Sequence, residues 1–209
     1  MLDVNWGVRK AVAKSKVEHN DETVKCGDDN GADLGNVHNR IYFYIDVNRG
    51  SILDLNKKIR ELGSDLLVQQ TKLGLDEPPP IYLHIHSYGG SVYAGLAGMA
   101  EIINAPVPVI TIVDGGAASA ATFLSVVGHK RLINRDAQIL IHQVSAGIWG
   151  TYEEIKDNAK NLDLLMKTVR SIYTQHTKIP EKKLIEMLKK DLWWDAKTCL
   201  RYGLVDEII

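Results

Sequence analysis

One short segment, residues 113–122, limits what this chain can fold into more than any other. It reads Val-Asp-Gly-Gly-Ala-Ala-Ser-Ala-Ala-Thr and places Ser119 among small residues. Residues 107–113 before it predict a buried strand, and residues 118–127 predict a buried helix. A serine in such a turn has its hydroxyl at the edge of the sheet, near a helix N-terminus that stabilises negative charge. The arrangement is typical of a nucleophile elbow, although the pattern is not G-x-S-x-G.

A serine alone does not establish catalysis, because small residues also serve to pack a helix tightly on a sheet. A catalytic serine needs a base and a group that orients the base. His142 stands at the end of the apolar strand predicted for residues 137–143, and Asp191 follows in residues 188–196. Taken one by one, these two residues are more typical of a structural histidine and a solvated charge. In the order Ser119, His142, Asp191 they supply the parts of a catalytic triad.

These motifs resemble the proteolytic subunits of Clp proteases, which are self-compartmentalised serine peptidases. The matching residues are Gly-Ala-Ala-Ser-Ala around Ser119, Leu-Ile-His-Gln around His142, and Asp191 upstream of a Tyr-Gly-Leu-Val-Asp run. Residues 81–95 are similar to the family's strand and Asn-Ser-Pro-Gly-Gly turn, and Tyr-Thr-Gln-His-Thr resembles the helix end before the aspartate segment. The resemblance covers roughly residues 38–209.

The resemblance implies an α/β fold of the crotonase type, with repeated ββα units and a protruding handle helix. It implies an oxyanion hole made by the backbone N–H groups of Gly90 and Ala120. Glycine adopts the backbone conformations that such a turn needs, and preorganised amides stabilise a developing oxyanion. An ordinary turn after a strand is the alternative for residues 89–90. The family also implies a peptide-binding segment, for which the candidate residues here are Gly89, Ser145, Ala146 and Gly147.

Three departures from the family pattern matter. His86 and Tyr88 stand where the family has asparagine and proline, so the turn loses a constraint on φ, and both side chains are candidates to line the substrate cleft. Ala120 stands where many members have methionine. Lys189 and Lys190 stand where the family often has an acidic residue and an arginine that pair between rings, which leaves the contact between rings open.

The chain divides into a polar N-terminal arm or axial loop region, residues 1–38, and a peptidase domain, residues 39–209. Alternation of strand and helix patterns predicts an α/β fold with a largely parallel sheet. Ser51 is predicted to cap the first helix, and Pro180 to start a short one. The other predicted elements are strands at 40–47, 81–86, 107–113, 131–134 and 138–142 and helices at 92–104, 118–127 and 152–176.

Composition excludes several classes of function. The net charge of −1 gives no reason to expect nucleic acid or an anionic membrane as a partner, and no apolar run is long enough to span a membrane. Cys26 and Cys199 form no C-x-x-C motif, which favours a reducing cytoplasm. We expect no cofactor or metal. The glycine-rich turns lack a Walker lysine, and His84, His129 and His176, without metal-ligand spacing, are assigned structural or surface roles.

The favoured function is therefore a serine endopeptidase that hydrolyses peptides and unfolded proteins inside an oligomeric chamber. The resemblance implies stacked heptameric rings and a separate AAA+ ATPase that delivers protein substrates, in the cytoplasm of a bacterium or an infected host. The sequences of residues 41–44 and 192–196 are similar to those of phage-encoded members of the family. Two alternatives stay open: a catalytically inactive chamber subunit, and a crotonase-type acyl-CoA enzyme, which needs no Ser-His-Asp set.

Overall fold

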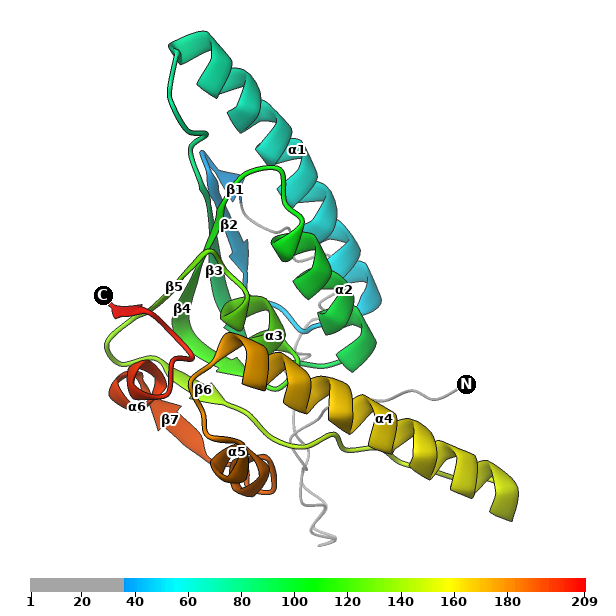
Figure 1. The fold of residues 1–209 in the computed structure, drawn as a ribbon. Helices are drawn as coiled ribbons and strands as arrows, with labels where there is room; N and C mark the ends of the chain where they lie inside the picture. The colour runs from blue at the N-terminus through cyan, green and yellow to red at the C-terminus, as the bar shows by residue number, and fades with distance from the viewer. Residues whose placement is uncertain (1–35) are drawn as a thin grey trace, which may run out of the picture.

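The structure is a computed structural model and describes residues 36–209. Strands and helices alternate along the chain, as the sequence predicts (Figure 1). The elements are β1 Asn36–Val37, β2 Arg40–Phe43, α1 Arg49–Leu73, β3 Ile81–Ser87, α2 Val92–Ile103, β4 Val109–Ala118, α3 Ala121–Val126, β5 Lys130–Ile133, β6 Gln138–Leu140, α4 Tyr152–His176, α5 Glu181–Leu188, β7 Trp193–Asp195, α6 Ala196–Arg201 and β8 Glu207–Ile208.

The sheet is mostly parallel, and β4 is its centre. The strand order is β1-β2-β3-β4-β5-β8, with every pair from β2 onward parallel. β4 has two neighbours on one edge: Ile110–Val113 pair with β5, whereas Gly116–Ala118 pair with β6. β6 in turn pairs antiparallel with β7. This α/β arrangement with a mostly parallel sheet is the crotonase-like fold that the sequence predicts.

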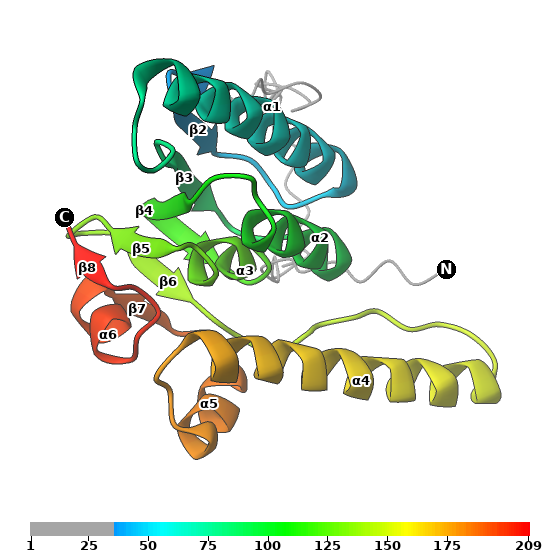
Figure 2. The same ribbon diagram turned by 45° about the horizontal axis from the view of Figure 1, so that its top comes forward.

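One face of the sheet forms the core. Alternate residues of β2 and β3 such as Phe43, Leu83 and Ile85 are fully buried, on the face that α1, α2 and α3 cover (Figures 1 and 2). The residues between them, Tyr42, His84 and others, lie on the opposite face and stay partly exposed. This period of two is what a sheet buried on one face requires.

Helix α4 has two different halves. Its bounds are those predicted from sequence, and its buried residues, Leu165, Val169, Ile172 and Tyr173, all lie in the second half. The first half, Tyr152 onward, extends away from the sheet and the other helices, and the segment that joins β6 to α4 runs alongside it (Figure 2). A long helix is stabilised mainly by packing of an apolar face, and here α4 packs on its own chain over half its length.

Four sequence predictions need correction. The cap of α1 is Asn48, whose side chain accepts from the N–H groups of Gly50 and Ser51; Ser51 completes the capping box from inside the helix. β2 ends at Phe43 and does not reach residue 47. β4 continues beyond residue 113 to Ala118, because Gly116–Ala118 pair with β6, and the helix after it begins at Ala121. β1, β7, α6 and β8 are too short for their periodicity to have been recognised.

The predicted N-terminal arm, residues 1–38, lies almost wholly outside the described residues, as does Cys26. Its division from the peptidase domain stays a prediction. Among residues 36–209, no helix has the length and apolar character that crossing a membrane requires.

Candidate active site

Ser119 sits in a strained turn between β4 and α3. Its φ of 58° is left-handed, a conformation that few non-glycine residues adopt and that recurs at active sites. The Ser119 N–H donates to the Leu140 carbonyl at 2.9 Å, and the Ser119 carbonyl accepts from the N–H and the hydroxyl of Thr122. Ser119 is buried, and its Oγ has no hydrogen-bond partner among the described residues. Strand, turn and helix thus hold the serine as a nucleophile elbow does.

His142 and Asp191 are in direct contact. His142 Nδ1 lies 2.9 Å from Asp191 Oδ1, so the imidazole donates from Nδ1 and Nε2 is its acceptor nitrogen. Burial lowers the pKa of His142, and the negative charge and hydrogen bond of Asp191 partly offset this by raising it. The Asp191 side chain is 79% exposed, whereas that of His142 is 16% exposed. The imidazole is therefore largely neutral near pH 7, as a general base must be.

Sheet pairing brings the three residues of the predicted triad to neighbouring strand ends. Ala118 pairs with Leu140, so His142 follows β6 beside the Ser119 turn. β7 pairs with β6, which places Asp191, just before β7, on the other side of His142. The hydrogen bond between Ser119 Oγ and the imidazole is not made in this structure, because Ser119 Oγ has no partner among the described residues.

The Gly89–Gly90 turn lies directly against Ser119. Both glycines have positive φ, 96° and 145°. A Cβ on Gly89 would lie 2.7 Å from Ser119 Cβ, and a Cβ on Gly90 would lie 2.2 Å from the Val47 carbonyl oxygen. The close approach explains why glycine stands at both positions, which an ordinary turn would not require.

The two amides predicted for the oxyanion hole are available as donors. Within residues 36–209, neither the Gly90 N–H nor the Ala120 N–H has a hydrogen-bond acceptor. The Val47 N–H instead donates to the Gly89 carbonyl, and the Ser91 N–H donates to the Val47 carbonyl, so the turn is held by its other groups. Unpaired N–H groups of this kind are what a developing oxyanion needs.

The segment after His142 has no regular secondary structure through residue 150. The Gln143 N–H donates to the Leu188 carbonyl, which fixes the start of the segment against α5. Further on, Ser145 and Gly147 are exposed and Ala146 is half-buried. The three predicted peptide-binding residues therefore lie at the surface, next to His142 in the chain.

Sequence reasoning did not find the role of Thr122 and Tyr173. Their hydroxyls lie 2.6 Å apart in the buried interior, and they join α4 to the turn that carries Ser119. Trp193, near Asp191, is 39% exposed and meets Tyr88 edge-on, with ring centroids 6.0 Å apart. The sequence signal for this contact is Thr122 itself, a polar residue in the first turn of a largely apolar helix that meets Tyr173.

His84 and His129, which were assigned structural or surface roles, have structural contacts. His84 bonds to Asp114, and His129 accepts from the Val109 N–H. Among residues 36–209, no cluster of histidine, cysteine and acidic side chains is arranged to hold a metal ion.

Comparison with known proteins places the chain in a family. The Clp protease family matches residues 35–209. The chain is 33% identical to an ATP-dependent Clp protease proteolytic subunit of Deinococcus radiodurans over 152 residues, which are 71% of this chain and 74% of that one. It is also 33% identical to proteolytic subunit 3 of Streptomyces avermitilis over 187 residues, 88% of this chain and 83% of that one, and 35% identical to subunit 1 of the same species over 162 residues, 76% and 75%.

The chain belongs to the Clp protease family. This membership makes it a hydrolase, a serine peptidase of the Clp type. The family match spans all the described elements from β1 to β8, so the Clp protease fold accounts for the whole described part of the chain.

Proposed function

We propose that Ser119 is the nucleophile of this Clp protease, with His142 as its general base and Asp191 as the group that orients the base. The main support is the left-handed turn of Ser119 beside the bonded pair of His142 and Asp191. In the reaction, Ser119 Oγ attacks the scissile carbonyl while His142 Nε2 takes the hydroxyl proton, and the imidazole then gives that proton to the leaving amine. The hydrogen bond between Ser119 Oγ and His142 must form before this proton transfer, because it is not made in this structure.

The Gly90 and Ala120 N–H groups are proposed to bind the oxyanion of the tetrahedral intermediate. Gly89 and residues 145–147 are proposed to bind the substrate backbone as an added strand, because the post-histidine segment is exposed and follows β6, whose Leu140 pairs with Ala118 next to the Ser119 turn. Main-chain pairing of this kind tolerates many side chains. Broad specificity toward unfolded chains follows from it.

Fluorophosphonate labelling followed by peptide mapping tests the nucleophile and separates the alternatives. An active serine peptidase is labelled at Ser119. A catalytically inactive chamber subunit is not labelled, and a crotonase-type acyl-CoA enzyme has no need of an activated serine. Labelling at a different residue would refute the assignment of Ser119, and labelling of the Asp191→Asn variant at the normal rate would refute the role of Asp191.

The assembly is proposed to be two stacked heptameric rings that enclose the active sites and receive protein substrates from a separate AAA+ ATPase, in the cytoplasm. The support in this chain is the projecting half of α4. Tyr152, Ile155 and Leu164 are 73%, 44% and 65% exposed, and Trp149 just before the helix is 99% exposed. Exposed apolar side chains on a projecting helix are typical of an interface.

Native mass spectrometry of the wild type and of an Ile155→Lys, Leu164→Lys double variant tests this assembly. We expect a tetradecamer for the wild type and smaller species for the variant. A Leu200→Lys variant is the control, because Leu200 is also exposed (40%) but lies on α6. A wild type that is monomeric under all mild conditions would contradict the proposal.

The N-terminal arm, residues 1–38, is proposed to shape an axial entrance. Deletion through residue 35 is expected to leave hydrolysis of the smallest peptides intact and to change degradation of long unfolded chains. Loss of small-peptide cleavage in assembled particles would assign the arm a role in catalysis instead.

A further inference from the structure

β4 has a bulge beside His86. The register between β3 and β4 shifts between Ile85 and Ser87, whose partners on β4 are Val113 and Ala117. One residue of β3, His86, therefore faces three residues of β4. Bulges of this kind bend a strand and re-aim the side chains near them, and they are frequent next to active sites.

The bulge, residues 114–116, is also where β4 changes its neighbour on the other edge. β5 pairs with β4 as far as Val113, and β6 pairs with it from Gly116 onward. Ser119 comes shortly after the bulge. Its position relative to His142, which follows β6, consequently depends on how the bulge is held.

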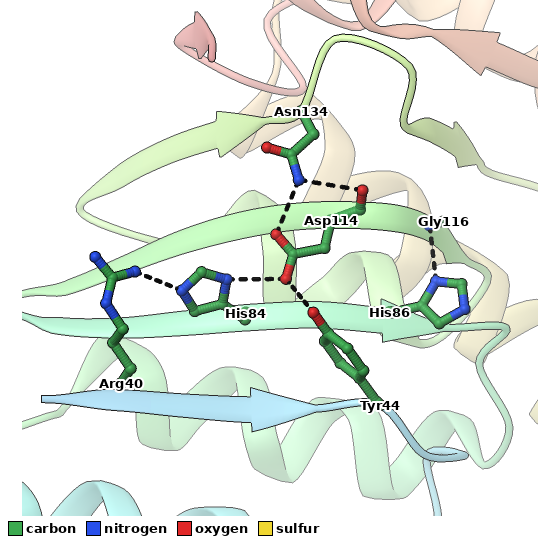
Figure 3. A network of polar contacts seen from close by, with 7 residues as sticks. All are labelled: Arg40, Tyr44, His84, His86, Asp114, Gly116 and Asn134. Carbon is green, nitrogen blue, oxygen red and sulfur yellow. Dashed lines mark hydrogen bonds and ion pairs between the residues drawn. The ribbon is translucent and has the colours of Figure 1, made fainter. Parts of the chain in front are cut away.

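His86 holds the end of the bulge nearer to Ser119. The Gly116 N–H donates to His86 Nδ1 at 3.0 Å (Figure 3), so an imidazole nitrogen replaces the backbone carbonyl that a regular ladder would supply. The ring is packed closely: a Cβ on Gly115 would lie 2.8 Å from Nδ1. Tyr44 and Tyr88 meet the ring edge-on, each with centroids 5.7 Å away.

Asp114 anchors the other end of the bulge. Its carboxylate accepts from the Tyr44 hydroxyl at 2.5 Å, from His84 Nδ1 at 2.8 Å and from Asn134 Nδ2 at 3.1 Å (Figure 3). Arg40 Nη1 lies 2.7 Å from His84 Nε2. A guanidinium group can only donate, so Nε2 is the acceptor and the proton of the neutral His84 ring is on Nδ1.

The two histidines of β3 thus hold the bulge with opposite tautomers. His84 donates from Nδ1 to Asp114, whereas His86 accepts at Nδ1 from Gly116 and carries its proton on Nε2. Both rings are neutral in this arrangement. The titratable and charged groups around His86 are Tyr44 and Tyr88 against the ring, and Asp114 and His84 further along the same face.

We propose that His86 is a positioning residue of the peptidase. Its neutral imidazole accepts the hydrogen bond from the Gly116 N–H, and this bond fixes the position of Ser119 relative to His142 and to the Gly90 N–H. This inference rests on the roles proposed above for those residues. A protonated imidazole has no acceptor at Nδ1. Protonation of His86 therefore breaks the bond to Gly116, loosens the bulge and lowers activity independently of His142.

Two substitutions separate the acceptor role from simple packing. In His86→Asn, the amide Oδ1 branches from Cγ as Nδ1 does in histidine, so it can accept from Gly116, and it does not titrate in mild acid. His86→Leu removes the acceptor. His129→Leu is the matched control, because His129 Nδ1 accepts from the Val109 N–H at the opposite end of β4, at 3.2 Å. Fluorophosphonate labelling of Ser119, peptide kcat and KM, and the pH dependence of kcat/KM are measured on assembled protein.

We expect His86→Leu to lower the labelling rate and kcat at least about tenfold with KM nearly unchanged, because small displacements of a reacting group are costly. His86→Asn is expected to stay within about threefold of wild type near neutral pH and to lose activity less steeply in acid, since one inhibitory protonation is gone. His129→Leu is expected to label and turn over like wild type.

Wild-type labelling and turnover in His86→Leu would overturn the proposal, and so would a His86→Asn variant as impaired as His86→Leu. If His86→Leu does not assemble, the His86→Asn pH profile decides, and a profile identical to wild type contradicts the proposal. Labelling at a residue other than Ser119 would refute the nucleophile itself, whereas labelling at Ser119 that is insensitive to His86→Leu refutes the positioning role alone.

Discussion

The Tyr173 hydroxyl lies 2.6 Å from the Thr122 hydroxyl, and this contact joins helix α4 to the turn that carries Ser119. Thr122 Oγ1 has a single proton, which it donates to the Ser119 carbonyl at 2.5 Å, so Tyr173 must be the donor to Thr122. Burial raises the pKa of Tyr173 well above its usual value, which keeps the hydroxyl protonated. Two buried hydroxyl groups thus connect helix α4 to the backbone of the candidate nucleophile.

Thr122→Val is predicted to weaken both the fold and the site. The substitution leaves the Tyr173 hydroxyl buried without an acceptor and removes a donor from the Ser119 carbonyl, which costs about 1–3 kcal/mol of the free energy of unfolding. Tyr173→Phe is expected to cost about 1 kcal/mol and to label nearly normally, because Thr122 still donates to Ser119. Urea unfolding and labelling of Ser119 measure the two effects. Equal labelling rates in the two variants would contradict the prediction that Thr122→Val impairs the site more than Tyr173→Phe does.

Gly89→Ala is predicted to abolish activity. At a φ of 96°, a Cβ would lie 2.7 Å from both the Ser119 Cβ and the Ala118 carbonyl oxygen. The turn or the serine must then move, and the strained conformation itself costs about 1–3 kcal/mol. Gly74→Ala is the control for strain alone, since Gly74 also has positive φ but nothing within 4 Å of a Cβ. Peptide hydrolysis that survives equally in both variants would show that the Gly89 turn does not contact the site as described.

In the His86→Asn variant, which lacks the inhibitory protonation of His86 proposed above, activity is predicted to persist to lower pH than an ordinary histidine base would allow. Burial lowers the pKa of His142, and catalysis needs the neutral ring, so the acid limb of kcat/KM lies below the usual value for histidine. When Asp191→Asn is added to this variant, the charge that raises the pKa of His142 is gone. The acid limb should therefore move to still lower pH, while kcat falls on the order of ten-thousandfold through loss of the correct tautomer. An acid limb that moves to higher pH would contradict the conclusion that the Asp191 charge raises the pKa of His142.

Asp206 is predicted to stabilise the fold in a pH-dependent way. Hydrogen bonds from Arg131 lower its pKa in the folded protein, so its contribution is present above the unfolded-state pKa and is lost as pH falls through the folded-state pKa. The side chain is 41% exposed, so solvent limits the contribution to about 1 kcal/mol or less. Urea unfolding should show a loss for Asp206→Asn near pH 7 that shrinks by about pH 3. If the unfolding free energies of wild type and Asp206→Asn differ by the same amount at both pH values, Asp206 does not link stability to pH.

Much of this fold was predictable because its periodic patterns are strong. The bounds of α4 follow from a long apolar stripe between Thr151 and Thr177, and the parallel core follows from alternating strands and helices. The cap of α1 was misplaced at Ser51 because Asn48 and Ser51 are both good capping residues three positions apart, and they share one capping box.

The candidate site was predictable as a set of residues but not as a geometry. Ser119, His142 and Asp191 stand in recognisable motifs, and sheet pairing brings their segments together. The bulge at residues 114–116 left no periodic signal, since two of its residues are glycines that suggested a turn. Only the register of β4 against β3 shows that His86 faces this bulge.

Ser119 is proposed to carry the peptidase chemistry, and peptide hydrolysis by Ser119→Ala tests this role most directly. Ser125→Ala is the matched control, because Ser125 is a buried serine of the adjacent helix α3 whose hydroxyl bonds to the Thr122 carbonyl at 3.1 Å. We predict that Ser119→Ala assembles normally and loses activity by at least about a thousandfold, whereas Ser125→Ala stays within about tenfold of wild type. Wild-type turnover by purified Ser119→Ala would contradict the account.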